Sequence, residues 1–128
     1  MNRRVVATLA ALVMTAAAPL RAHHSVVSVY QIDRTETIEG DLVELRWQNP
    51  HSVVYVNARN NAGDVQRYVV EWEAGLQLSR QGVTQDTLKP GDHVIITGNP
   101  SRRLEDHALH LRTIVRPRDG WRWHGTFD

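Results

Sequence analysis

The 128-residue sequence contains no cysteine, so disulfides, thiolate zinc sites, iron–sulfur clusters and cysteine nucleophiles are excluded. The sequence also lacks a large excess of positive or negative residues. The net charge is only +1, without the basic excess that is typical of a nucleic-acid-binding domain. No G-x-S-x-G elbow, H-E-x-x-H helix or glycine-rich phosphate loop occurs, which makes an enzyme the less favoured class.

What remains is the composition of one soluble globular domain. The length allows a single hydrophobic core, and the balance of 41% apolar and 23% charged residues is ordinary for a folded protein. Histidine is the unusual component, with seven copies. Imidazole is therefore the functional chemistry that the composition favours.

Residues 1–22 are typical of a secretory signal peptide. A short positive segment, Asn2-Arg3-Arg4, precedes an apolar run of about 14 residues from Val5 to Ala18. A retained membrane anchor is the alternative, but this run is too short to span a hydrocarbon core of ~30 Å comfortably. Cleavage before Pro19 would place proline directly after the cut, whereas cleavage after Ala22 avoids it. We therefore expect His23 to be the first residue of the mature protein.

Export predicts a periplasmic or secreted protein with no stable membrane span after cleavage. The predicted signal removes three arginines and no acidic residue, so the net charge of the mature chain changes from +1 to −2. We expect no nucleic acid partner for such a chain. A metal ion or a protein of the cell envelope is the expected partner.

Five segments have the β-branched, alternating composition of strands, and one short segment has a helical period. The predicted strands are 38–47, 52–58, 65–73, 93–98 and 108–115, with a helix over 74–81. Three strands, a helix and two strands is the order of an OB-fold barrel, whose closure removes exposed edges. A β-sandwich, which usually has about seven strands, is the alternative. The sequence thus predicts an all-β, five-stranded OB-fold-like barrel with one short helix over 23–116, and a Trp-rich tail over 117–128.

Strand periodicity also predicts the bend and the core of the barrel. The apolar parity of the first strand changes beside Gly40, which indicates a bulge or sharp bend. In the fifth strand the parity places Leu109, Leu111 and Val115 on the inner face. The predicted core consists of Leu42, Leu45, Val54, Val56, Val70, Val94, Ile96, Leu109 and Leu111.

The chain resembles a family of small exported bacterial proteins of uncharacterised function. The resemblance covers roughly residues 23–115 and implies an OB-like fold and export, but no activity. It rests on His23-His24-Ser25, Ile38-Glu39-Gly40, Trp47-Gln48-Asn49-Pro50-His51, the region of Glu71, and Leu88-Lys89-Pro90-Gly91-Asp92.

The double histidine at the predicted mature N-terminus is the sharpest chemical feature. The α-amine and imidazole of His23 can chelate one metal ion, and His24 adds a second imidazole. Such nitrogen ligands suit Cu(II), which prefers tetragonal geometry and binds most tightly among the divalent ions. The competing interpretation is a flexible polar chain end.

His51, which follows Asn49-Pro50, is the candidate third ligand. A loop fixed by proline would present its imidazole toward the N-terminus, although Asn49 and His51 capping the turn is an equally simple interpretation. Glu71 is the candidate outer-shell acceptor for an imidazole N–H, and Glu73 shares its strand face. Parity within the fifth strand predicts that His110 faces elsewhere and contributes nothing.

The aromatic residues leave a second function class open. Trp47, Tyr55, Tyr68 and Trp72 would form a stacking platform if they were exposed, as in OB folds that bind oligonucleotides or sugars. Their parity favours core packing for Tyr68 and Trp72. Two hypotheses therefore stand: a metal-binding module that buffers or carries copper, and a barrel that contacts a peptide, glycan or envelope protein.

Cleavage after Ala22 is directly testable. Because a free α-amine on His23 requires that cut, intact-mass analysis of the secreted protein should give a chain that starts at His23. A mature chain starting at any other residue would remove the amine from the metal site.

Overall fold

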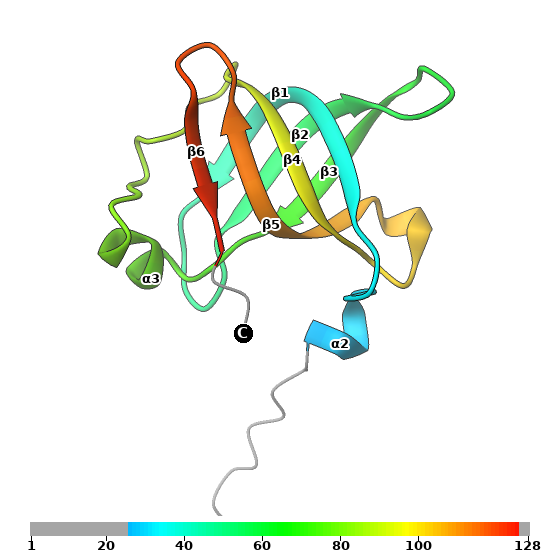
Figure 1. Ribbon diagram of the computed structural model, residues 1–128, viewed down its shortest axis with the longest axis horizontal. Helices are drawn as coiled ribbons and strands as arrows, with labels where there is room; N and C mark the ends of the chain where they lie inside the picture. The colour runs from blue at the N-terminus through cyan, green and yellow to red at the C-terminus, as the bar shows by residue number, and fades with distance from the viewer. Residues whose placement is uncertain (1–25, 126–128) are drawn as a thin grey trace, which may run out of the picture.

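A computed structural model describes residues 26–125 and shows a small β-barrel (Figure 1). The predicted signal peptide, His23 and His24 lie outside the described residues. No helix within residues 26–125 is long and apolar enough to cross a membrane. The elements are α2 (Val26–Val29), β1 (Glu36–Arg46), β2 (Val53–Arg59), β3 (Val65–Glu71), α3 (Gly75–Arg80), β4 (His93–Pro100), a 3-10 turn η1 (Leu104–Asp106), β5 (Ala108–Arg116) and β6 (Trp121–His124).

The strands form one sheet in the order β3-β2-β1-β4-β5-β6, and an additional pairing of β3 with β5 closes it. All neighbours are antiparallel except β3 and β5, which run parallel. The five-stranded OB-like barrel predicted from the sequence is therefore confirmed. The helix α3 connects β3 to β4, also as predicted.

The segment predicted as a Trp-rich tail contains a sixth strand. β5 pairs with β3 only through residues 108–110, and β6 pairs with the same strand farther along, through residues 113–116. Trp123 of β6 is buried, packs edge-on against Trp72 with ring centroids 5.2 Å apart, and donates its indole N–H to Gln81 Oε1 at 2.6 Å. The strand therefore covers the core where β3 and β5 separate.

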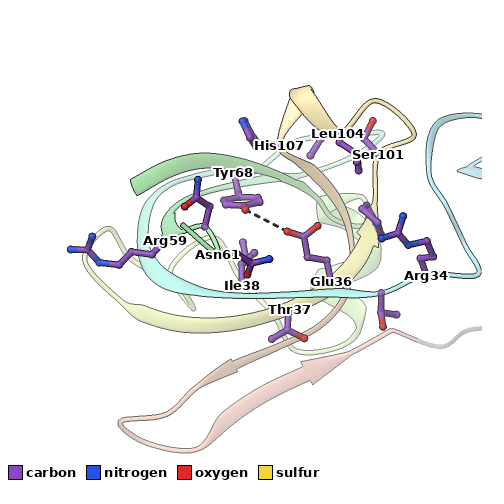
Figure 2. A pocket seen from close by; sticks show the side chains of 14 residues that line it. Arg34, Glu36, Thr37, Ile38, Arg59, Asn61, Tyr68, Ser101, Leu104 and His107 are labelled. Atoms are coloured by element: carbon purple, nitrogen blue, oxygen red, sulfur yellow. Dashed lines mark hydrogen bonds between the residues drawn. The ribbon is translucent and has the colours of Figure 1, made fainter. Parts of the chain in front are cut away.

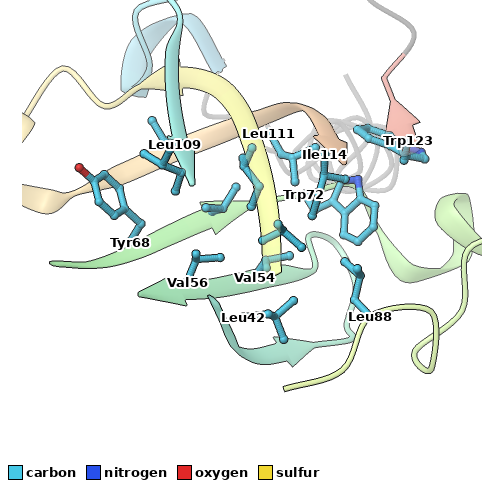
Figure 3. Close-up of a cluster of buried hydrophobic side chains, with 14 of the residues drawn as sticks. Leu42, Val54, Val56, Tyr68, Trp72, Leu88, Leu109, Leu111, Ile114 and Trp123 are labelled. Carbon is cyan, nitrogen blue, oxygen red and sulfur yellow. The ribbon is translucent and has the colours of Figure 1, made fainter. Parts of the chain in front are cut away.

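Alternating side chains of the strands fill the barrel (Figure 3). The predicted core is confirmed, with Leu45 only partly buried at its edge. Tyr68 and Trp72 are also buried, as their parity predicted. The inward position near the end of β5 is Ile114 and not Val115, so that expectation was wrong. A register shift opposite Thr97 and Gly98 adds one residue to β5 and changes its parity.

The irregularity that the switch in parity predicts for β1 is confirmed, and it lies at the switch from Leu42 to Val43. The register with β2 shifts between Leu42 and Glu44, whereas Gly40 itself is regularly paired with Ala58 and Val94. Gly40 has a different role. A Cβ there would overlap the Asn57 carbonyl oxygen and approach Ala58 Cα to 2.8 Å, so only glycine permits this close approach of β1 to β2.

The Leu88–Asp92 turn before β4 is fixed by a buried carboxylate. Asp92 accepts the Lys89 amide at 3.0 Å and binds Arg116 of β5 at 2.9 Å. Partial burial opposes ionisation, but these partners hold the pKa of Asp92 below its ordinary value. The turn is thus tied to the far end of β5.

Two glycine substitutions separate the effect of space from that of backbone conformation. Gly40→Ala should lower the free energy of unfolding by about 3 kcal/mol, because backbone atoms cannot move aside as side chains do. Gly82→Ala should cost about 1–2 kcal/mol, because its φ of 81° disfavours a Cβ although the space around it is open. Urea unfolding measures both, and equal costs would contradict the close approach at Gly40.

Candidate functional site

A group of polar side chains gathers where β3 and β5 pair to close the barrel. β3 and β5 pair there through three residue pairs, Val69↔Ala108, Val70↔Leu109 and Glu71↔His110, and we call this pairing the seam. Val70 and Leu109 are buried in the core. Because side chains alternate along a strand, Glu71 and His110 both lie on the outer face and adjoin each other across the seam.

Glu71 is the centre of this group. Its Oε2 accepts the Tyr30 hydroxyl at 2.8 Å, and its Oε1 lies 3.4 Å from Nδ1 of His51. The Tyr30 ring packs against the His110 ring, with centroids 5.4 Å apart. Tyr30 is held there by a bridge to Ser101, directly after β4. Four segments that are distant in sequence thus meet at the Glu71 carboxylate. We call their side chains the seam group: Tyr30, His51, Glu71 and His110.

The pKa values of Tyr30 and His110 shift in opposite directions at the seam. Burial, together with the hydrogen bond to Glu71, raises the pKa of Tyr30 well above its ordinary value, so the phenol stays protonated and donates. Burial lowers the pKa of His110; the charge of Glu71 opposes this shift, and His51 and Arg112 add to it. His110 is therefore a neutral imidazole at neutral pH.

The structure brings together two of the predicted site residues, His51 and Glu71. Glu73 instead accepts the Gln81 amide at 2.8 Å and does not join them. The expectation that His110 faces elsewhere was wrong. Parity within β5 gives the face on which His110 lies but does not show which residue lies beside it, and the parallel register places Glu71 there.

Histidine and carboxylate side chains do not form a complete metal site within residues 26–125. No group of three or more of them in this part of the chain lies close enough to hold a metal ion. A metal site that included these residues would need further ligands from outside residues 26–125, where His23 and His24 lie.

His93, on β4, differs from His110 in the direction of its pKa shift. Its Nε2 lies 2.9 Å from Glu39 and its Nδ1 lies 2.8 Å from Asp41, both on the adjacent strand β1. These hydrogen bonds raise the pKa of His93 and favour the imidazolium form. The stabilisation of the folded state by protonated His93 is fully present below pH 6.5 and is lost as the pH rises through the raised pKa of His93. With both nitrogens occupied, His93 is an ion-pair residue.

The fold and the seam group define a small OB-like β-barrel with a histidine–carboxylate cluster on its wall. Residues 10–110 match the model of a family of unknown function, DUF6152. Because that match spans most of the chain, the protein belongs to the DUF6152 family. No curated protein and no solved structure matches the chain.

The electrostatic coupling at the seam predicts opposite pKa changes in two variants. Glu71→Gln should lower the pKa of His110 further, because it removes the charge that favours protonation. His51→Asn should raise it, because it removes an imidazole that opposes protonation. NMR titration of the imidazole resonances measures both shifts, with His93 as the unaffected control. Shifts of the same sign would contradict this arrangement.

Proposed function

We propose that the protein is an exported binding module that holds Cu(II), or another late transition metal, in a site shared between the mature N-terminus and the seam. The amine and imidazole of His23, together with His24, supply nitrogen ligands from the chain end. His51 supplies a ligand from the barrel, and Glu71 is its outer-shell partner. The observation that carries the proposal is the meeting of His51, Glu71 and His110 beside Tyr30, close to the N-terminal end of the described chain.

The chain length supports this assignment. Val26 begins α2, and its carbonyl accepts the Tyr30 amide at 2.8 Å, so a single helical turn separates Val26 from Tyr30, which contacts Glu71. In the sequence, His24 lies two residues before Val26. An extended residue spans at most about 3.5 Å, and two residues reach about 7 Å beyond Val26. The double histidine is therefore tethered within a few residues of the seam.

The chemistry of the barrel residues also suits a metal. Nδ1 of His51 faces Glu71, which leaves Nε2 as the ligand atom in the usual carboxylate–histidine–metal arrangement. A metal ligand must be a neutral imidazole, and burial keeps His110 neutral. We therefore add His110 to the candidate ligands His23, His24 and His51.

Copper titration of the mature protein tests the proposal. A variant extended by Gly-Ser-Gly-Ser before His23 should bind Cu(II) at least tenfold more weakly, because the α-amine is moved away from His23 and neither histidine stands at the second or third position. Zn(II) should bind more weakly than Cu(II) to the mature chain. An extended chain that binds as tightly as the mature one would exclude the amine as a ligand.

Single substitutions test the barrel side of the site. His51→Ala and His110→Ala should each weaken Cu(II) binding about tenfold or more, and Glu71→Gln should weaken it about 10–100-fold through its effect on His51. His124→Ala, at an exposed position on β6, is the matched control. Binding should also fall as the pH drops below about 6.5, where imidazoles take up protons. Equal, small effects of all the histidine variants would indicate scattered surface binding and overturn the proposal.

A further inference from the structure

The end of the barrel opposite α3 contains a cavity that is independent of the seam group. Its volume is about 360 Å³, and the start of β1, the β2–β3 loop and the β4–β5 connection enclose it (Figure 2). This volume lies at the lower end of the range for small-molecule sites, which is about 300–1,000 Å³. The cavity is thus suited to a small molecule and not to a polymer.

A carboxylate lies at the centre of this cavity. Glu36 Oε1 lies 3.4 Å from the Tyr68 hydroxyl, and Figure 2 shows the two side chains pointing toward each other. Tyr68 is buried and Glu36 is half-buried, and burial together with Glu36 raises the pKa of Tyr68. No arginine, lysine or histidine among the described residues forms an ion pair with Glu36. Within residues 26–125 the Glu36 carboxylate therefore has no cationic partner.

The wall beside Glu36 is aromatic. The His107 ring packs edge-on against the Tyr68 ring, with centroids 5.7 Å apart. His107 has a φ of 45°, a left-handed conformation that is rare for a residue other than glycine. A carboxylate beside aromatic faces is the environment that an ammonium group favours, through charge pairing and cation–π contact.

The rim of the cavity has the opposite charge. Arg34 and Arg59 are exposed and lie on opposite sides in Figure 2. Arg34 donates to Gln31 Oε1 at 3.2 Å, and Arg59 donates to the Gly63 carbonyl at 2.7 Å. Both acceptors are neutral, so neither guanidinium is neutralised by a carboxylate within residues 26–125. A guanidinium at such a position favours a ligand carboxylate.

We propose that this cavity binds a small zwitterion of the amino-acid type, either a free amino acid or a dipeptide. The ammonium group lies against Glu36 and beside the paired rings of Tyr68 and His107, and the carboxylate lies at the rim against Arg34 or Arg59. The order of charges, negative inside and positive at the rim, is complementary to a ligand that enters amine first. This inference does not depend on the metal site, because none of the proposed metal ligands lines the cavity.

Calorimetry of the metal-free mature protein tests the proposal. EDTA-treated protein is required, because amino acids themselves chelate copper. The probes are the twenty L-amino acids and the dipeptide Gly-Leu, and each probe that binds is compared with its N-acetyl and C-amide derivatives. At least one zwitterion should bind, and each derivative should bind at least tenfold more weakly. Absence of binding by every probe, or equal binding of an N-acetyl derivative, would overturn the proposal.

Two matched substitutions on β1 locate the binding. Glu36→Gln should abolish binding of the amine, whereas Glu44→Gln, which alters an exposed carboxylate paired only with Arg46, should leave it unchanged. Circular dichroism confirms that both variants fold. Arg59→Gln should weaken binding of the zwitterion more than that of its C-amide. Equal losses in the Glu36 and Glu44 variants would place the ligand elsewhere and contradict the assignment.

Discussion

The parallel pairing of β3 with β5 is the constraint on which the rest of the structure depends. Only three residue pairs form it, yet they join β3 to β5 and convert an open sheet into a closed barrel. The same register makes Glu71 and His110 neighbours. Beyond the third pair the two strands separate, and β6 occupies the vacated edge of β5 with Trp123 against Trp72. The short pairing of β3 with β5 therefore accounts for the closure of the barrel, for the position of the candidate site and for the place of β6.

The two ends of the barrel differ in chemistry because apolar side chains fill one end, whereas the other end contains a cavity. At the end where β3 leads into α3, the interior is filled by the large buried side chains of Leu78, Leu88 and Trp72. At the opposite end the core gives way to the pair of Glu36 and Tyr68 and to a cavity. The polar chemistry thus lies at two separate places, on the outer wall at the seam and inside the open mouth.

Local patterns predicted most of this fold, and long-range pairing accounts for what they missed. Strands, helix and core follow from residue alternation and turn residues, which act within a few positions of each other. His51 and Glu71 were predicted as chemically suited residues. The proximity of His110 to Glu71 depends on a parallel register between strands about forty residues apart, which neither strand encodes alone. The short β6 was missed because its pairing with β5, and not its own composition, makes it a strand.

The central claim is that one metal ion binds at the seam, and paramagnetic NMR tests it most directly. Cu(II) broadens the resonances of nearby nuclei, so substoichiometric copper added to the mature protein should act on a small set of signals. The account predicts selective loss of the Tyr30, His51, Glu71 and His110 signals, while those of His93 and Tyr68 persist. Broadening centred on His93, or spread evenly over all the histidines, would contradict it.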